Sequence, residues 1–104
     1  MGIGVRVIEY SGEVVEMLAA GYDVEPVREA AASDPGRYPL LAGVDEYDDT
    51  TFNARQAKVL ITELTSLAAT EELAGTTAQL ITLAELLLPA PGRPHHRQLV
   101  FVGD

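Results

Sequence analysis

The expected architecture follows mainly from residues 52–88, FNARQAKVLITELTSLAATEELAGTTAQLITLAELLL, in which two helical patterns follow each other across a short link. In residues 52–68 the apolar side chains recur every three or four positions, so they share one face of a helix. That face consists of Ala57, Leu60, Ile61, Leu64, Leu67 and Ala68. The opposite, solvent-facing side is expected to carry Arg55, Lys58, Thr62, Glu63 and Ser66.

The second pattern predicts a helix that Thr70 caps, with Glu71 and Glu72 in its first turn, where carboxylates interact favourably with the helix dipole. Gly75 is expected to weaken the start of this helix by roughly 1 kcal/mol relative to Ala. The short link around Ala69 predicts that the two helices pack antiparallel. The apolar stripe of the second helix consists of Leu73, Leu80, Ala84 and Leu87, widened by Ile81 and Leu88.

Strands are predicted at the two ends of the sequence. Residues 3–10 alternate Val and Ile with other residues, a pattern typical of a strand. Ser11-Gly12 then predicts a tight turn, and residues 13–18 are expected to return as the second strand of a hairpin, with a short helix as the competing interpretation. Residues 97–102 form the closing strand, and its expected partner is the strand at residues 3–10.

A short helix is expected between the hairpin and the long helices. Asp23 is its predicted N-cap, Pro26 lies in its first turn, and residues 33–36 end it. Residues 37–49 are expected to be irregular. The predicted architecture is therefore α+β: a small antiparallel sheet (N-terminal hairpin plus C-terminal strand) packed against an antiparallel helical hairpin and one short helix, in a single domain over residues 1–104.

Composition limits the classes of function. The chain has 104 residues, 16 Asp and Glu against 7 Lys and Arg, a net charge of -9, and no cysteine. The absence of cysteine excludes a disulfide scaffold, a cysteine zinc site and a thiol nucleophile. Because its few basic residues are scattered, we expect no nucleic-acid binding. With no basic leader before an apolar run, and no apolar run near the roughly 20 residues that span a bilayer, we expect a cytoplasmic protein without membrane contact.

The densest polar segment lies before the first long helix. Asp45, Glu46, Asp48 and Asp49 are four carboxylates within five positions, around Tyr47. Carboxylate oxygens suit hard cations, but the spacing departs from that of a calcium-binding loop. We therefore interpret the segment as a helix start, where Asp48, Asp49, Thr50 or Thr51 caps the helix and favours its dipole. Structural roles are expected for Thr50 and Phe52, and for Asn53 and Gln56, whose amides would hold the preceding loop through backbone hydrogen bonds.

Catalytic patterns are missing from the sequence. It has no G-x-S-x-G nucleophile turn, no phosphate-binding glycine motif, and only two histidines, His95 and His96. Adjacent residues on a strand point to opposite faces, so these histidines cannot easily share a metal, and we interpret them as solvated. We expect no enzymatic activity, no cofactor and no metal.

The segment also resembles part of a family of small uncharacterised bacterial proteins. The residues that carry the resemblance are a D-x-Y-x-D-T-x-F-N-x-x-Q block, here Asp45 to Gln56, and an apolar closing strand that runs from His96 to Gly103-Asp104. The resemblance covers roughly two thirds of the chain. It implies that the block is a fixed local structure, and it implies no activity.

Three functions follow as hypotheses. The first, which we favour, is a non-enzymatic acidic interaction module, for example an immunity or inhibitor protein, whose Asp45, Glu46, Asp48 and Asp49 meet a basic protein partner around the anchor Tyr47. The second is a small metal- or ligand-binding protein that uses the Asp45–Asp49 loop, with His96 as a fourth ligand. The third is a structural homodimer formed through sheet edges or the broad apolar helix pair.

Overall fold

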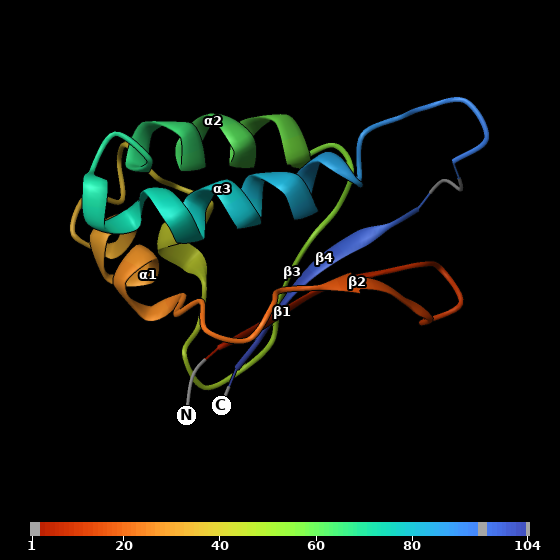
Figure 1. Cartoon of the computed structure of the whole chain (residues 1–104), viewed down its shortest axis with the longest axis horizontal. Coiled ribbons are helices and arrows are strands. Elements are labelled where there is room, and N and C mark those ends of the chain that lie inside the picture. Colours follow the sequence, from red (N-terminus) through yellow and green to blue (C-terminus); the bar gives the residue numbers. More distant parts are fainter. Residues whose placement is uncertain (1–2, 94–95, 104) are drawn as a thin grey trace.

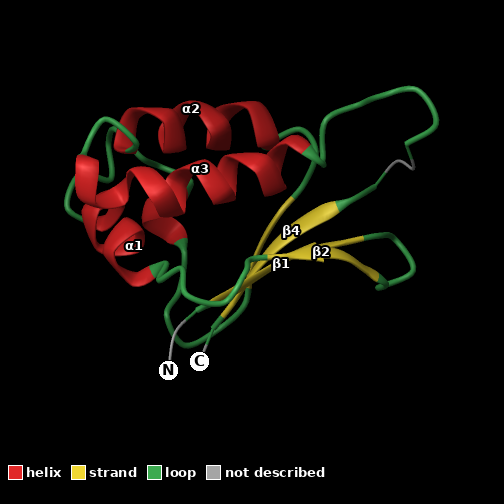
Figure 2. Ribbon diagram, in the orientation of Figure 1, coloured by secondary structure: helices red, strands yellow, loops and turns green. Residues whose placement is uncertain are grey.

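The computed structural model describes residues 3–93 and 96–103 (Figure 1). Its elements follow the chain in the order β1 (Gly4–Ile8), β2 (Val14–Met17), α1 (Glu25–Ala32), the 3-10 turn η1 (Leu41–Gly43), β3 (Thr50–Phe52), α2 (Ala57–Leu67), α3 (Glu71–Glu85) and β4 (Gln98–Val102). Figure 2 shows the helices together on one side of the sheet. The predicted α+β class, with a helical hairpin against an antiparallel sheet, is confirmed.

The sheet has the strand order β2-β1-β4-β3, and every neighbouring pair is antiparallel. The predicted hairpin is present, and Gly12 adopts φ 90° in its turn, a conformation that glycine tolerates without strain. The predicted pairing of the closing strand is also confirmed, because β4 runs beside β1 from Gly4↔Val102 to Ile8↔Gln98.

The strand β3 corrects the sequence analysis. We predicted a helix from residue 52, but Thr50–Phe52 pairs with β4 and α2 begins only at Ala57. Phe52 is 4% exposed, and its ring lies in a T-shaped arrangement with that of Phe101 at a centroid distance of 5.7 Å. Thr and Phe suit a pleated surface, and burial of an aromatic ring against the sheet outweighs a weak helical propensity.

The core lies between the sheet and the helical hairpin. Alternate residues of β1 and β4 face the helices, and Val5, Val7, Leu99 and Phe101 are buried there. The helices meet them with a continuous apolar layer that includes Leu60, Leu64, Leu80, Leu83 and Ala84. This layer follows the periodicity read from the sequence.

The helix ends agree with the sequence in part. Thr70 occupies the N-cap position of α3 as predicted, although its side chain makes no capping hydrogen bond, and α3 continues through Gly75 without a break. The N-cap of α1 is Val24 and not the predicted Asp23, although Asp23 Oδ1 accepts a hydrogen bond from Glu25 N at 3.0 Å. Asp23, one residue before the N-cap, therefore accepts a hydrogen bond from one of the free N–H groups in the first turn of α1.

Two arginines of the following linker stabilise the C-terminal end of α3. Arg93 donates to the carbonyls of Glu85 and Leu88 at 3.0 and 2.6 Å, and Arg97 donates to that of Leu86 at 3.2 Å. Cations at this end complement the helix dipole and satisfy its free carbonyls. None of the helices in the described part of the chain is long and apolar enough to cross a membrane.

Candidate functional site

The segment Asp45–Asp49, which we call the acidic loop, connects η1 to β3. Its three aspartates accept hydrogen bonds from main-chain amides: Asp45 Oδ1 from Tyr47 N at 2.8 Å, Asp48 Oδ1 from Asp49 N at 2.9 Å, and Asp49 Oδ1 from Gly103 N at 3.2 Å. Asp45 N in turn donates to Thr50 Oγ1 at 3.0 Å. The carboxylates thus bind separate amides and fix the path of the backbone.

The predicted role of these acids at a helix start is wrong. The strand β3 and the turn at residues 53–56 separate the acidic loop from α2, whose N-cap is Gln56. Because Phe52 is drawn into the sheet, the carboxylates of the loop order the entry to β3. Asp side chains bond to nearby main-chain amides in turns as well as at helix ends, so the same residues fit both interpretations.

Asn53 and Gln56 form a reciprocal pair in the turn before α2. Asn53 N donates to Gln56 Oε1 at 2.9 Å, and Gln56 N donates to Asn53 Oδ1 at 3.1 Å. The side-chain oxygen of each residue therefore accepts a hydrogen bond from the backbone N–H of the other, in the manner of a capping box. This pair, and not the acidic loop, prepares the start of α2.

The acidic loop lies directly against the end of β4. A Cβ atom added at Gly103 would lie 2.2 Å from Asp48 N and 2.5 Å from Asp48 O. No side chain fits in that space, so glycine is required here by close approach of two backbones. The resemblance rests on two separate parts of the sequence, the block at residues 45–56 and the end of the closing strand. These two parts are thus in contact.

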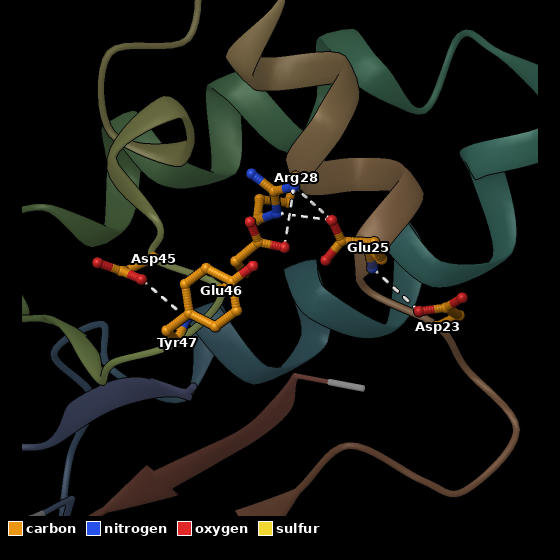
Figure 3. A network of polar contacts seen from close by, with 6 residues as sticks. All are labelled: Asp23, Glu25, Arg28, Asp45, Glu46 and Tyr47. Atoms are coloured by element: carbon orange, nitrogen blue, oxygen red, sulfur yellow. Dashed lines mark hydrogen bonds and ion pairs between the residues drawn. The ribbon is translucent and has the colours of Figure 1, made fainter. Parts of the chain in front are cut away.

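Glu46 reaches the helix α1 through its side chain. Figure 3 shows it pointing to Arg28 on α1, with Glu46 Oε2 at 3.7 Å from Arg28 Nη2. Arg28 also binds Glu25, whose Oε1 accepts from Arg28 Nε at 2.9 Å. The hydrogen bond from Arg28 lowers the pKa of Glu25, and the same bond raises the pKa of Arg28.

Tyr47 projects from the middle of the loop. It is 76% exposed, and its hydroxyl makes no hydrogen bond to another described residue. Its backbone, in contrast, is fixed by Asp45 on one side and by Gly103 on the other. The loop therefore presents an exposed aromatic ring on an ordered backbone between carboxylates.

Glu63 is a polar residue that the sequence analysis misplaced. We expected it on the solvent face of α2, but it is 4% exposed and accepts hydrogen bonds from Leu40 N at 3.2 Å and Leu41 N at 3.0 Å. Its position three residues after Leu60 and four before Leu67 places it on the apolar face, so helical spacing contained the signal. The carboxylate anchors the start of η1, just before the acidic loop.

The other residues considered for chemistry lie apart from the loop. His96 has φ 69°, and its ring centroid is 5.9 Å from that of Tyr10 at the tip of the hairpin. His95 lies outside the described residues. Within residues 3–93 and 96–103, no three His, Asp or Glu side chains are arranged to hold a metal ion.

Comparison with known proteins adds no family or fold relative. No family model matches the chain, and no curated protein or solved structure does. The resemblance drawn from the sequence accordingly remains a prediction.

Proposed function

We propose that the protein is a non-enzymatic interaction module that docks onto a basic protein surface through the acidic loop, as an immunity or inhibitor protein would. The observation that carries the proposal is Tyr47, which is exposed on a backbone already fixed by Asp45 and Gly103. A preordered loop loses little conformational entropy on binding. An aromatic ring surrounded by charged groups is a typical anchor of protein interfaces.

The charges of the loop suit the same role. Asp45, Asp48 and Asp49 each use Oδ1 for a main-chain amide, so the second carboxylate oxygen of each can accept a bond from a partner's Lys or Arg. The net charge of -9 would attract a basic partner from a distance and speed the encounter. Affinity should therefore fall as salt is added.

The edge of the sheet at β2 is a less suitable docking surface. The strand has only 4 residues, its register shifts at Val7/Ile8, and Glu16 Oε1 accepts a hydrogen bond from Met17 N at 3.1 Å. A short, irregular edge with a carboxylate on its amide is protected against addition of another strand. This argues for docking through side chains of the loop and against a homodimer joined at β2.

The experiment uses single substitutions that leave the loop's own hydrogen bonds in place. Tyr47→Ala removes the anchor, and Glu46→Lys reverses a charge that binds no loop amide. The matched controls are Tyr10→Ala, which removes a tyrosine that is 87% exposed at the hairpin tip, and Glu13→Lys, which changes the net charge equally. Partners are captured from lysate, purified, and titrated against each variant at two salt concentrations.

We expect Tyr47→Ala and Glu46→Lys to weaken binding of the purified partner at least about tenfold, as hot-spot truncations do. The two controls should bind like the wild type, apart from a small loss at low salt for Glu13→Lys. If Glu13→Lys weakens binding as much as Glu46→Lys does, only the overall charge matters. If Tyr10→Ala weakens binding as much as Tyr47→Ala does, the proposed docking site is wrong.

A further inference from the structure

We infer that Gly103, the residue after β4, is the positioning residue of the acidic loop: its missing side chain lets the end of the strand lie against Tyr47 and Asp48 and so fixes where Tyr47 projects. The importance of this placement for binding rests on the proposed function. The contact itself stands on the geometry alone.

The approach of the two backbones is too close for any other residue. A Cβ at Gly103 would lie 2.2 Å from Asp48 N and 2.5 Å from the carbonyl carbon of Tyr47, whereas real Cβ contacts essentially never fall under 3.0 Å. Both neighbours are backbone atoms, so no change of rotamer can relieve the overlap. At Gly43, on the other side of the loop, an added Cβ would meet nothing within 4 Å.

A hydrogen bond and the sheet register support the same attachment. Gly103 N donates to Asp49 Oδ1 at 3.2 Å, and two residues earlier Phe101 pairs with Thr50, the first residue of β3. Residues 48–50 are therefore tied to residues 101–103 at successive points. These attachments hold the chain immediately after Tyr47, and Asp45 holds Tyr47 N from the other side.

The geometry also predicts that the effect is local. The buried side chains of β4 are Leu99, Val100 and Phe101, and Gly103 lies beyond the last residue of the strand. A methyl group at residue 103 would displace the loop without entering the core. Loss of the attachment should thus change residues 45–50 and leave α2 and α3 as they are.

The test compares Gly103→Ala with the matched control Gly43→Ala by residue-resolved amide hydrogen exchange and chemical shifts. We expect exchange at Tyr47 N and Asp49 N to become about tenfold faster in Gly103→Ala, with shift changes confined to residues 45–50 and 101–103. Gly43→Ala should change neither amide. Unchanged loop amides in Gly103→Ala, or an equal change across the whole molecule, would overturn the inference.

A double-mutant cycle then separates positioning from a general structural role. With the purified partner, Gly103→Ala should weaken binding in the wild-type background and have a clearly smaller effect beside Tyr47→Ala, because part of its effect passes through the ring and the rest through the displaced carboxylates of Asp48 and Asp49. Additive losses would show that Gly103 does not act through Tyr47. If Tyr47→Ala has no effect on binding, the proposed function fails, while the exchange experiment still decides whether Gly103 positions the loop.

Discussion

Glu63 and the aspartates of the acidic loop make the same kind of hydrogen bond in two different environments. Each carboxylate accepts hydrogen bonds from main-chain amides, but Glu63 is buried under η1, and the aspartates lie at the surface next to an exposed tyrosine. A buried carboxylate must be fully compensated, whereas a surface carboxylate keeps water as an alternative partner. Burial, more than the number of hydrogen bonds, therefore separates a structural acid from one available to a partner.

The largest effect should come from Glu63. Glu63→Ala leaves Leu40 N and Leu41 N without their acceptor inside the protein, so we expect a loss of roughly 3 kcal/mol in the free energy of unfolding. Chemical denaturation measures this loss. Glu63→Gln, which keeps one carbonyl acceptor, should lie between Ala and the wild type. A loss below about 0.5 kcal/mol for Glu63→Ala would show that the site is solvated and that the contrast with the acidic loop is false.

A smaller effect is expected at Asp49, which binds Gly103 across 54 residues of sequence. Asp49→Ala removes one surface hydrogen bond, so the free energy of unfolding should fall by about 1 kcal/mol. Asp49→Asn keeps an acceptor oxygen and should stay close to the wild type in the same denaturation experiment. If Asn and Ala are equally destabilised, the charge and not the hydrogen bond holds the loop.

The contrast between these two sites also shows what could be predicted from the sequence. Regular periodicity predicted α3, the hairpin, the closing strand and, apart from its start, α2, because those patterns depend on local spacing. Glu63 was misplaced because the polar character of its side chain was weighed above its position on the apolar face. Its partners, the amides of Leu40 and Leu41, lie in an irregular segment whose course no periodicity describes.

The prediction that the acidic loop starts a helix was wrong for a different physical reason. Acids followed by Thr and a helical pattern satisfy the rules for a helix start, but Thr50–Phe52 pairs with β4 and Phe52 packs against Phe101, which makes the segment a strand. The contact of Gly103 with Asp48 could not be inferred either, because it joins residues far apart in the sequence through backbone atoms. Long-range contacts of this kind leave no periodic signal.

Glu25 provides a third type of carboxylate, bound by a cation in place of amides. Arg28 lowers the pKa of Glu25 from its ordinary 4.5, so the ionised acid stabilises the folded state. That stabilisation is fully present above about pH 4.5 and is lost as the pH falls through the lower pKa of the folded protein.

Glu25→Gln should therefore cost less than about 1 kcal/mol at pH 7, as a partly exposed ion pair does. The difference from the wild type should shrink when denaturation is repeated toward pH 3. Glu13→Gln, on the hairpin, serves as the control for loss of a charge. A difference that stays constant between pH 7 and pH 3 would mean that Arg28 does not stabilise the ionised form of Glu25.

The smallest effect on stability should come from Tyr47, whose side chain is exposed. Because its ring is exposed and its fixed backbone does not depend on the side chain, Tyr47→Ala should change the free energy of unfolding by no more than about 0.5 kcal/mol. The same variant is expected to weaken partner binding. Tyr47→Ala should therefore lower affinity with little loss of stability, whereas the main effect of Glu63→Ala should be on stability. A large loss of stability for Tyr47→Ala would mean that the ring packs onto the protein and supports the loop, and then an effect on binding could not be assigned to docking.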